Sequence, residues 1–374
     1  MSLHSLYELT GDFVIYRNLE PYDTRVPGLQ QAWSAMGLPD NTVVRKRDPL
    51  YPQAATWLLQ QIHAIHAPHT RPCELLLIGD TEGNDGAAFW RLKTHTGWAG
   101  TAFIGSEKPH EAASAVWKDE IFVTNRWQGI ARWLCELEER NLAIDERTIA
   151  IVDIDKTALG ARGRNHRPID AARLSALTAT VTQALGPDAD LEEFARIYHE
   201  LNQSTYHDLT GDNQDYLAYI CIMVGAGLIP LNELKARHDE GRLNAFVDFI
   251  SSVEAQAEKL SRPLMTVHRA VYESYRAGDP TPFKDFRRNE FRATVAAMGH
   301  LPDDVSETLR AQEEICLTRE VWDACRWLQE RGVLIAALSD KPDEACAPDP
   351  AESDPTLRPI HRTPTHLLGQ ALSI

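Results

Sequence analysis

The chain has 374 residues, of which 43% are hydrophobic and 25% are charged, as in ordinary globular proteins. One hydrophobic core seldom organises so many residues, so the length predicts two domains. The formal net charge of −16 argues against a nucleic-acid partner, because proteins that bind phosphate backbones present a basic face. A small anionic substrate stays compatible with this charge, since a local basic pocket can lie inside an acidic protein.

The cysteine pattern and the hydropathy of the sequence indicate the cellular compartment in which the protein is expected. The six cysteines are scattered and form no C-x-x-C pair, which favours a reduced, cytoplasmic protein. The opening MSLHSLYELTGD lacks the basic and apolar regions of a signal peptide. The longest apolar run, residues 216–231, is shorter than the roughly 20 residues of a membrane span and contains two glycines and a proline. We therefore expect a buried helix there and no membrane partner; the sequence gives no oligomeric state.

The first half of the chain alternates short apolar runs with amphipathic stretches. Three runs of strand length are bounded by turn or charged residues: 74–79, 101–105 and 120–124. Residues 125–140 then carry a helical apolar stripe that ends before Asn141. The run 148–153 is apolar at almost every position, which is typical of a parallel strand buried on both faces. Alternation of this kind predicts a parallel sheet.

The second half begins with a long block of helical periodicity. From about residue 169 to 312 the strand signal disappears and successive segments repeat apolar residues at helical spacing. A helix over 318–331 and a buried strand over 332–338 follow, and the tail from Pro342 has no clear period. The predicted fold is therefore α/β, a doubly wound, Rossmann-like parallel sheet with an all-helical domain inserted after the strand that ends at Asp153.

The sequence Asp153-Ile154-Asp155-Lys156-Thr157 follows one of the buried strands. Ligands of parallel α/β sheets bind outside the carboxyl ends of the strands. Residues two apart in an extended chain point to the same side, so one carboxylate can attack phosphorus while its neighbour moves a proton. A solvated strand end with an aspartate helix cap is the alternative interpretation.

Three further positions point to the same chemistry. Asp80 and Asp85 follow the strand 74–79, and carboxylates of this kind are ligands for Mg²⁺, although an Asp/Gly-rich turn has the same composition. Ser339 follows the strand 332–338, where a hydroxyl can hold a phosphoryl oxygen or cap a helix. Lys46 precedes a helical stretch, and a lysine can neutralise both a nucleophile and a phosphoryl group, although most lysines are only surface residues.

Together these residues resemble the haloacid dehalogenase (HAD) superfamily. Its first motif, D-x-D-x-[TV], is matched by Asp153, Asp155 and Thr157, and its second, a strand ending in Ser or Thr, by Ser339. Its third motif, a lysine, is loosely matched by Lys46, with Lys341 as a substitute. Its fourth, G-D followed by a second Asp, is matched by Gly79, Asp80 and Asp85.

The order of these motifs departs from the family. Members usually carry them in the order one, two, three, four, whereas this chain has three, four, one, two, which resembles a circular permutation joined at about 138–147. Permutation is tolerated where the original ends of a domain lie together at its surface. The resemblance then implies a HAD-type core formed by residues 1–159 and 316–374. Residues 160–315 would form a helical cap domain that controls access to the site.

The resemblance also implies an activity, which is hydrolysis of a small phosphorylated metabolite through an aspartyl-phosphate. Asp153 would be the nucleophile and Asp155 the general acid and base, with Ser339 and Lys46 supporting the phosphoryl group. Mg²⁺ would be held by Asp153, the backbone carbonyl of Asp155 and Asp80, with Asp85 as a further ligand or the holder of a bound water. Transfer to an acceptor other than water, as in a phosphomutase or phosphotransferase, and an inactive relative that binds a phosphorylated ligand are the alternatives.

A basic segment directly after the first motif, ARGRNHRPID, offers candidate substrate-binding groups. Its potential cations could hold a second anionic group of the substrate, and Thr157 lies just before them. A solvated linker would have the same composition. The candidates are Arg162, Arg164, His166 and Arg167.

Overall fold

The computed structural model describes residues 2–352 and 354–373, and its contacts divide the chain into two compact units. The sheet unit consists of Met1–Asp170 and Thr294–Ile374, and the helical unit is Ala171–Ala293. The protein is α/β, as the alternation of strands and helices predicts, and its main sheet has seven strands in the order β1-β8-β6-β2-β3-β5-β4. Every neighbouring pair is parallel except β4 and β5.

The strands that the apolar runs predict are present. They are β2 (Glu74–Gly79), β3 (Ala99–Gly105), β5 (Ile121–Thr124), β6 (Thr148–Val152) and β8 (Leu334–Leu338). Two edge strands, β1 (Val14–Ile15) and β4 (Ala115–Lys118), complete the sheet, and β7 (Leu317–Thr318) pairs with β9 (Leu367–Leu368) in a separate ribbon.

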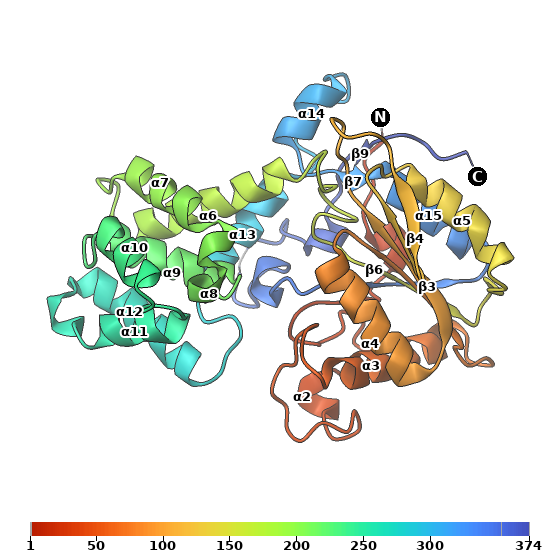
Figure 1. Cartoon of the computed structure of the whole chain (residues 1–374), viewed down its shortest axis with the longest axis horizontal. Helices are drawn as coiled ribbons and strands as arrows, with labels where there is room; N and C mark the ends of the chain where they lie inside the picture. Colours follow the sequence, from red (N-terminus) through yellow and green to blue (C-terminus); the bar gives the residue numbers. More distant parts are fainter. Residues whose placement is uncertain (1, 353, 374) are drawn as a thin grey trace. The chain divides into compact units, whose positions relative to one another are not determined.

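Helices pack on both faces of the main sheet (Figure 1). Alternate strand residues such as Leu75 and Leu77 join one core with helices α2 (Leu29–Ala32), α3 (Tyr51–His66) and α4 (Ala87–Thr96). On the opposite face lie α5 (Gly129–Glu139) and α15 (Arg319–Gln329). There Trp133 of α5 donates a hydrogen bond to Thr101 of β3 at 3.1 Å. The sheet is thus covered on both sides, and only its edges are left for ligands.

Shorter helices complete the sheet unit. These are α1 (Tyr7–Thr10) and α14 (Glu307–Glu313), with single turns at Asp343–Ala345 and Ile360–Arg362 in the tail. The tail from Pro342 is otherwise irregular, as its composition predicts, apart from β9.

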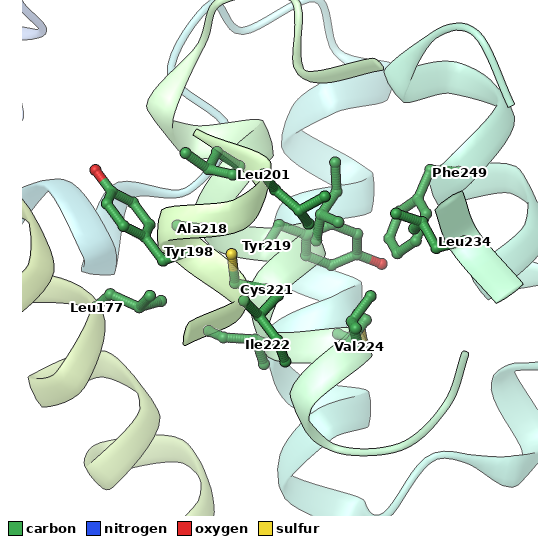
Figure 2. Close-up of a cluster of buried hydrophobic side chains, with 14 of the residues drawn as sticks. Leu177, Tyr198, Leu201, Ala218, Tyr219, Cys221, Ile222, Val224, Leu234 and Phe249 are labelled. Atoms are coloured by element: carbon green, nitrogen blue, oxygen red, sulfur yellow. The ribbon is translucent and has the colours of Figure 1, made fainter. Parts of the chain in front are cut away.

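The helical unit is built around an apolar helix. Helix α9 (Gln214–Gly225) is buried at every position from Leu217 to Val224, and Asn213 caps its start by accepting a hydrogen bond from the N–H of Asp215. Figure 2 shows Tyr219, Cys221 and neighbouring apolar side chains packed in this core. This confirms the buried helix predicted within residues 216–231. The surrounding helices are α6 (Arg167–Leu185), α7 (Leu191–Leu201), α8 (His207–Thr210), α10 (Leu231–Asp239), α11 (Phe246–Glu254), α12 (Arg262–Arg276) and α13 (Lys284–Ala296).

Within the described residues, no helix has both the length and the apolar character needed to cross a membrane.

The limits of the helical unit are narrower than the 160–315 expected for the inserted domain. Residues on either side of it are bound into the sheet unit by hydrogen bonds. The N–H of Gly160 donates to the carbonyl of Cys316 at 2.9 Å, and the Asn165 side chain donates to the carbonyl of Glu314 at 2.8 Å. The two connections between the units therefore pair with each other before the helical unit begins.

Candidate active site

The topology of the sheet marks one place for a ligand. After β6 the chain continues, through the helical unit, to β8 on one side, whereas after β2 it continues through α4 to β3 on the other side. Neighbouring strands β6 and β2 thus form a topological switch point, where a crevice opens at the carboxyl edge. Asp153 directly follows β6 and Asp80 directly follows β2, and the N–H of Asp153 donates to the carbonyl of Ile78 at 2.9 Å.

Three buried carboxylates meet at this point. One oxygen from each of Asp80, Asp85 and Asp153 lies within 4.8 Å of the others. Asp85 returns to the strand end through the turn Glu82–Gly86, and its Oδ2 accepts hydrogen bonds from the N–H groups of Asp80 at 3.1 Å and Thr81 at 3.2 Å. The residue before Asp80 has to be small. A Cβ on Gly79 would lie 2.4 Å from the Cβ of Asp85, so only glycine lets the turn close on the strand.

Lys46 is the cation at the centre of this cluster. Its Nζ donates to Asp153 Oδ1 at 2.8 Å and to Asp85 Oδ1 at 3.1 Å, and the side chain is buried. The backbone carbonyl of Lys46 accepts a hydrogen bond from Arg91 of α4 at 2.6 Å, which fixes the lysine relative to the sheet. The alternative lysine, Lys341, is directed to Asp155 instead, with 3.7 Å between Nζ and Oδ1.

The cluster carries more negative than positive charge, and the pKa values reflect this. Burial, together with the charge of Asp85, raises the pKa of Asp153 to about 7 in spite of Lys46. Burial and the neighbouring carboxylates Asp153 and Asp85 also raise the pKa of Asp80 well above its usual value. Burial acts in the same direction on Asp85, but Lys46 and the hydrogen bonds from Asp80 outweigh it, so the pKa of Asp85 is lowered.

Of the remaining residues of the first two motifs, Thr157 contacts Asp153 directly. Thr157 is fully buried and donates from Oγ1 to Asp153 Oδ2 at 3.3 Å, so it holds the carboxylate from the side opposite Lys46. Asp155 is partly exposed, and its carboxylate lies outside the group of three. Ser339 follows β8, the strand next to β6, and its Oγ accepts the N–H of Lys341 at 3.2 Å.

Of the four predicted substrate-binding cations, Arg162 reaches the cluster. Its Nε donates to Asp80 Oδ2. Arg164 points elsewhere, with hydrogen bonds to Glu107 at 2.8 Å and Glu320 at 2.9 Å that tie its loop to the sheet unit. The Nδ1 of His166 accepts the N–H of Gly163 at 3.0 Å. The fourth, Arg167, is exposed at the start of α6. The structure therefore does not gather these four groups around one anion.

A polar hollow of about 440 Å³ opens at the carboxyl edge beyond β3 and β5. Arg126 and Arg164 line it, but both guanidinium groups already donate to protein oxygens. To bind a second anion here, the protein would have to give up these bonds. Its wall also includes Glu107, Gln128, Glu307, Thr308 and Gln370.

The donor set fits a hard divalent cation. Mg²⁺ and Mn²⁺ prefer oxygen ligands, and three carboxylates facing only Lys46 and Arg162 leave negative charge that such an ion would balance. Asp80, Asp85 and Asp153 are the residues that could hold it. The sequence predicted this convergence, but it gave no sign of Arg91, whose contact with Lys46 depends on how α4 packs.

Comparison of the chain with models of known protein families, with curated proteins and with solved structures finds no match.

Proposed function

We propose that the protein is a Mg²⁺-dependent phosphatase that hydrolyses a small phosphate ester through an aspartyl-phosphate on Asp153. One observation carries this proposal. The Asp153 carboxylate lies buried at the switch point of the sheet, in contact with Lys46 and within 4.8 Å of the carboxylates Asp80 and Asp85. Burying three carboxylates together costs free energy, and proteins retain such a cluster where it binds a cation or takes part in chemistry.

Strand order supports the permuted HAD-like arrangement. If the strands are counted from β6, continuing through β8 and β1 and then β2, β3 and β5, their order in space is 3-2-1-4-5-6. This is the order of the doubly wound Rossmann arrangement. Counting in this way joins the C-terminal segment to the N-terminal one, and these two segments are paired. His4 and Thr365 exchange two backbone hydrogen bonds, each of 2.8 Å.

In the first step of this mechanism an oxygen of Asp153 attacks the phosphorus in line, and the bond from phosphorus to the ester oxygen breaks. Asp155, as a carboxylic acid, gives its proton to the leaving oxygen. Lys46 and Thr157 hold the nucleophile in place, and the charge of Lys46 favours its ionised form. Ser339, which follows the neighbouring strand β8, would donate its hydroxyl to a phosphoryl oxygen.

In the second step a water molecule attacks the phosphorus of the aspartyl-phosphate, Asp155 takes a proton from that water, and inorganic phosphate leaves with Asp153 restored. Partial exposure suits Asp155 for this role, because it can exchange protons with solvent while Asp153 stays buried. A Mg²⁺ ion held by Asp80, Asp85 and Asp153 would offset the charge of the phosphoryl oxygens.

The test is hydrolysis of p-nitrophenyl phosphate by the full chain, with and without Mg²⁺. Asp153→Asn should lower Mg²⁺-dependent turnover by about three orders of magnitude or more, the scale on which loss of a covalent nucleophile acts. Asp170→Asn is a matched control, because Asp170 pairs with Lys156 and lies outside the carboxylate cluster. Activity that survives in Asp153→Asn would contradict the mechanism.

Two related functions are separated by the same assay. Adding methanol as an acceptor distinguishes hydrolysis from transfer, since a phosphotransferase yields methyl phosphate in place of inorganic phosphate. A protein that binds Mg²⁺ but turns over neither p-nitrophenyl phosphate nor any member of a panel of phosphorylated metabolites is a ligand-binding relative.

A further inference from the structure

Arg162 is the more exposed of the two cations that contact the cluster. Its side chain is 40% exposed, whereas that of Lys46 is 10% exposed and bonded to two carboxylates. The contact of Arg162 with the cluster runs through one oxygen, Oδ2 of Asp80. The guanidinium end of this ion pair is exposed, whereas the Asp80 side chain is only 6% exposed, so Arg162 can leave Asp80 at low cost only when another cation offsets the same carboxylate.

The backbone of Arg162, in contrast, is held firmly. Its N–H donates to the carbonyl of Lys156 at 2.8 Å, and its carbonyl accepts hydrogen bonds from the N–H of Glu107 at 2.8 Å and from Trp127 Nε1 at 3.2 Å. The side chain can therefore change partner while its Cα stays beside the switch point.

Asp80 can bind either of two cations, the divalent ion or the guanidinium of Arg162. It is one of the three carboxylates that could hold a divalent ion, and it is also the partner of Arg162. A divalent ion bound to Asp80 competes with the guanidinium for the same carboxylate. A guanidinium released there has no need to leave the site, because its planar fork fits the oxygens of a phosphoryl group.

We propose that Arg162 is an exchangeable counter-ion, which yields Asp80 to the divalent cation and then binds the phosphoryl group of the substrate. The inference rests on the proposed function, since it assumes that a metal and a phosphoryl group share this site. Arg162 then has opposite effects on the binding of the metal and of phosphate. Arg162 weakens binding of the metal alone and strengthens binding of phosphate once the metal is present.

Binding of Mn²⁺, followed by the electron paramagnetic resonance signal of the free ion, tests the first effect, and calorimetry with inorganic phosphate at saturating Mn²⁺ tests the second. We expect Arg162→Gln to bind Mn²⁺ alone about three- to tenfold more tightly, as loss of a partly exposed competing charge predicts. The same variant should bind phosphate about tenfold more weakly, as loss of a charged hydrogen bond predicts.

Lys108→Gln is the control for net charge. Lys108 lies in the loop next to Glu107, is 55% exposed and pairs with Glu111, so its removal changes the charge equally without touching the cluster. Both constants should stay within about twofold of wild type, as for exposed charges screened by salt. Arg162→Lys keeps the charge but loses the fork, so it should restore most of the competition with Mn²⁺ and little of the phosphate affinity.

The outcomes separate the two proposals. Wild-type protein that binds no Mn²⁺ refutes the proposed function and with it this inference. Wild-type protein that binds Mn²⁺, with Arg162→Gln unchanged or weaker toward the metal alone, refutes the exchange and leaves the phosphatase proposal standing. A merely structural role for Arg162 predicts that both affinities fall together.

Discussion

Both units bury charged side chains, but they balance these charges differently. In the helical unit the buried Arg287 donates to Asp215 at 2.8 Å and to Glu290 at 2.6 Å, and Arg173 donates to Glu290 at 3.3 Å. The N–H of Phe283 adds a bond of 3.1 Å to Asp215. Two guanidinium groups thus face two carboxylates, and the protein itself satisfies them.

The sheet unit buries three carboxylates around Lys46, and the partly exposed Arg162 pairs with one of them, Asp80. Here the positive charges do not offset all the carboxylates, and burial together with the neighbouring carboxylates raises the pKa values of Asp153 and Asp80. This difference in charge balance distinguishes buried charges that have a structural role from those that have a functional role. A balanced cluster needs no ligand to offset its charge, whereas an unbalanced one leaves charge that a bound ion can offset.

Breaking the balanced cluster should have the largest effect. Arg287→Met leaves Asp215 and Glu290 buried without their main partner, so the helical unit should lose about 3–5 kcal/mol of its free energy of unfolding. Urea denaturation followed by circular dichroism measures this. Arg196→Met, which removes an exposed ion pair with Glu193 in the same unit, should cost less than about 1 kcal/mol. Equal losses in the two variants would contradict the comparison.

Supplying the missing positive charge should stabilise the sheet unit. Mg²⁺ at about a hundred times its dissociation constant should add about 2.7 kcal/mol to the free energy of unfolding of this unit. Thermal unfolding with increasing Mg²⁺ measures the gain, and chelation with EDTA should reverse it. Asp80→Asn should show a much smaller gain, because it removes one of the three candidate ligands. The same gain in wild type and variant would place the ion elsewhere.

A single unbalanced carboxylate should show a smaller effect that depends on pH. Burial, with Glu344 nearby, raises the pKa of Asp343 to about 7. The folded protein keeps this proton up to pH 7 while the unfolded chain loses it near 3.8, so stability from this group is present at pH 4 and lost as the pH rises to 7. Asp343→Asn stays neutral and should be more stable than wild type at pH 8. The pKa difference corresponds to about 4 kcal/mol, which the partial exposure of Asp343 to solvent should reduce to about 1–2 kcal/mol.

Thermal unfolding of wild type and Asp343→Asn at pH 4 and pH 8 checks this. The difference between the two proteins should vanish at pH 4, where both carry a neutral side chain at position 343. A difference that is the same at the two pH values would show that the carboxyl group keeps its ordinary pKa.

The central strands followed from sequence, because continuous apolar runs reveal strands buried on both faces. The convergence of Asp153, Asp80, Asp85 and Lys46 was expected from the resemblance to the HAD motifs, since Lys46 taken alone had the character of a surface lysine. The edge strands were not predicted. In β4 exposed residues such as Val116 alternate with half-buried ones, so no apolar run marks that strand. β1 pairs over only two residues of the four-residue apolar run 13–16, which the sequence analysis did not single out as a strand.

The partners of the basic segment could not be predicted from sequence. The chain turns sharply at Lys156, Gly160 and Gly163, where φ is positive, and these turns send Arg162 to Asp80 but Arg164 to Glu107 and Glu320. The spacing of residues along the sequence does not predict where the chain makes such turns. The hydrogen bond from Thr157 to Asp153 was not predicted either. The two residues are four apart in a segment that is neither helix nor strand, so no regular spacing indicated that their side chains meet.

The position of the helical unit has a consequence for biosynthesis. β6 pairs with β2 on one side and with β8 on the other, but β8 follows the roughly 120 residues of Ala171–Ala293 in the chain. At about 5–20 residues per second, a ribosome needs on the order of ten seconds to make that segment. During this interval the apolar strand TIAIV leaves one row of backbone groups without a strand partner from β8. The nascent sheet must therefore be shielded until its last parallel strand is made.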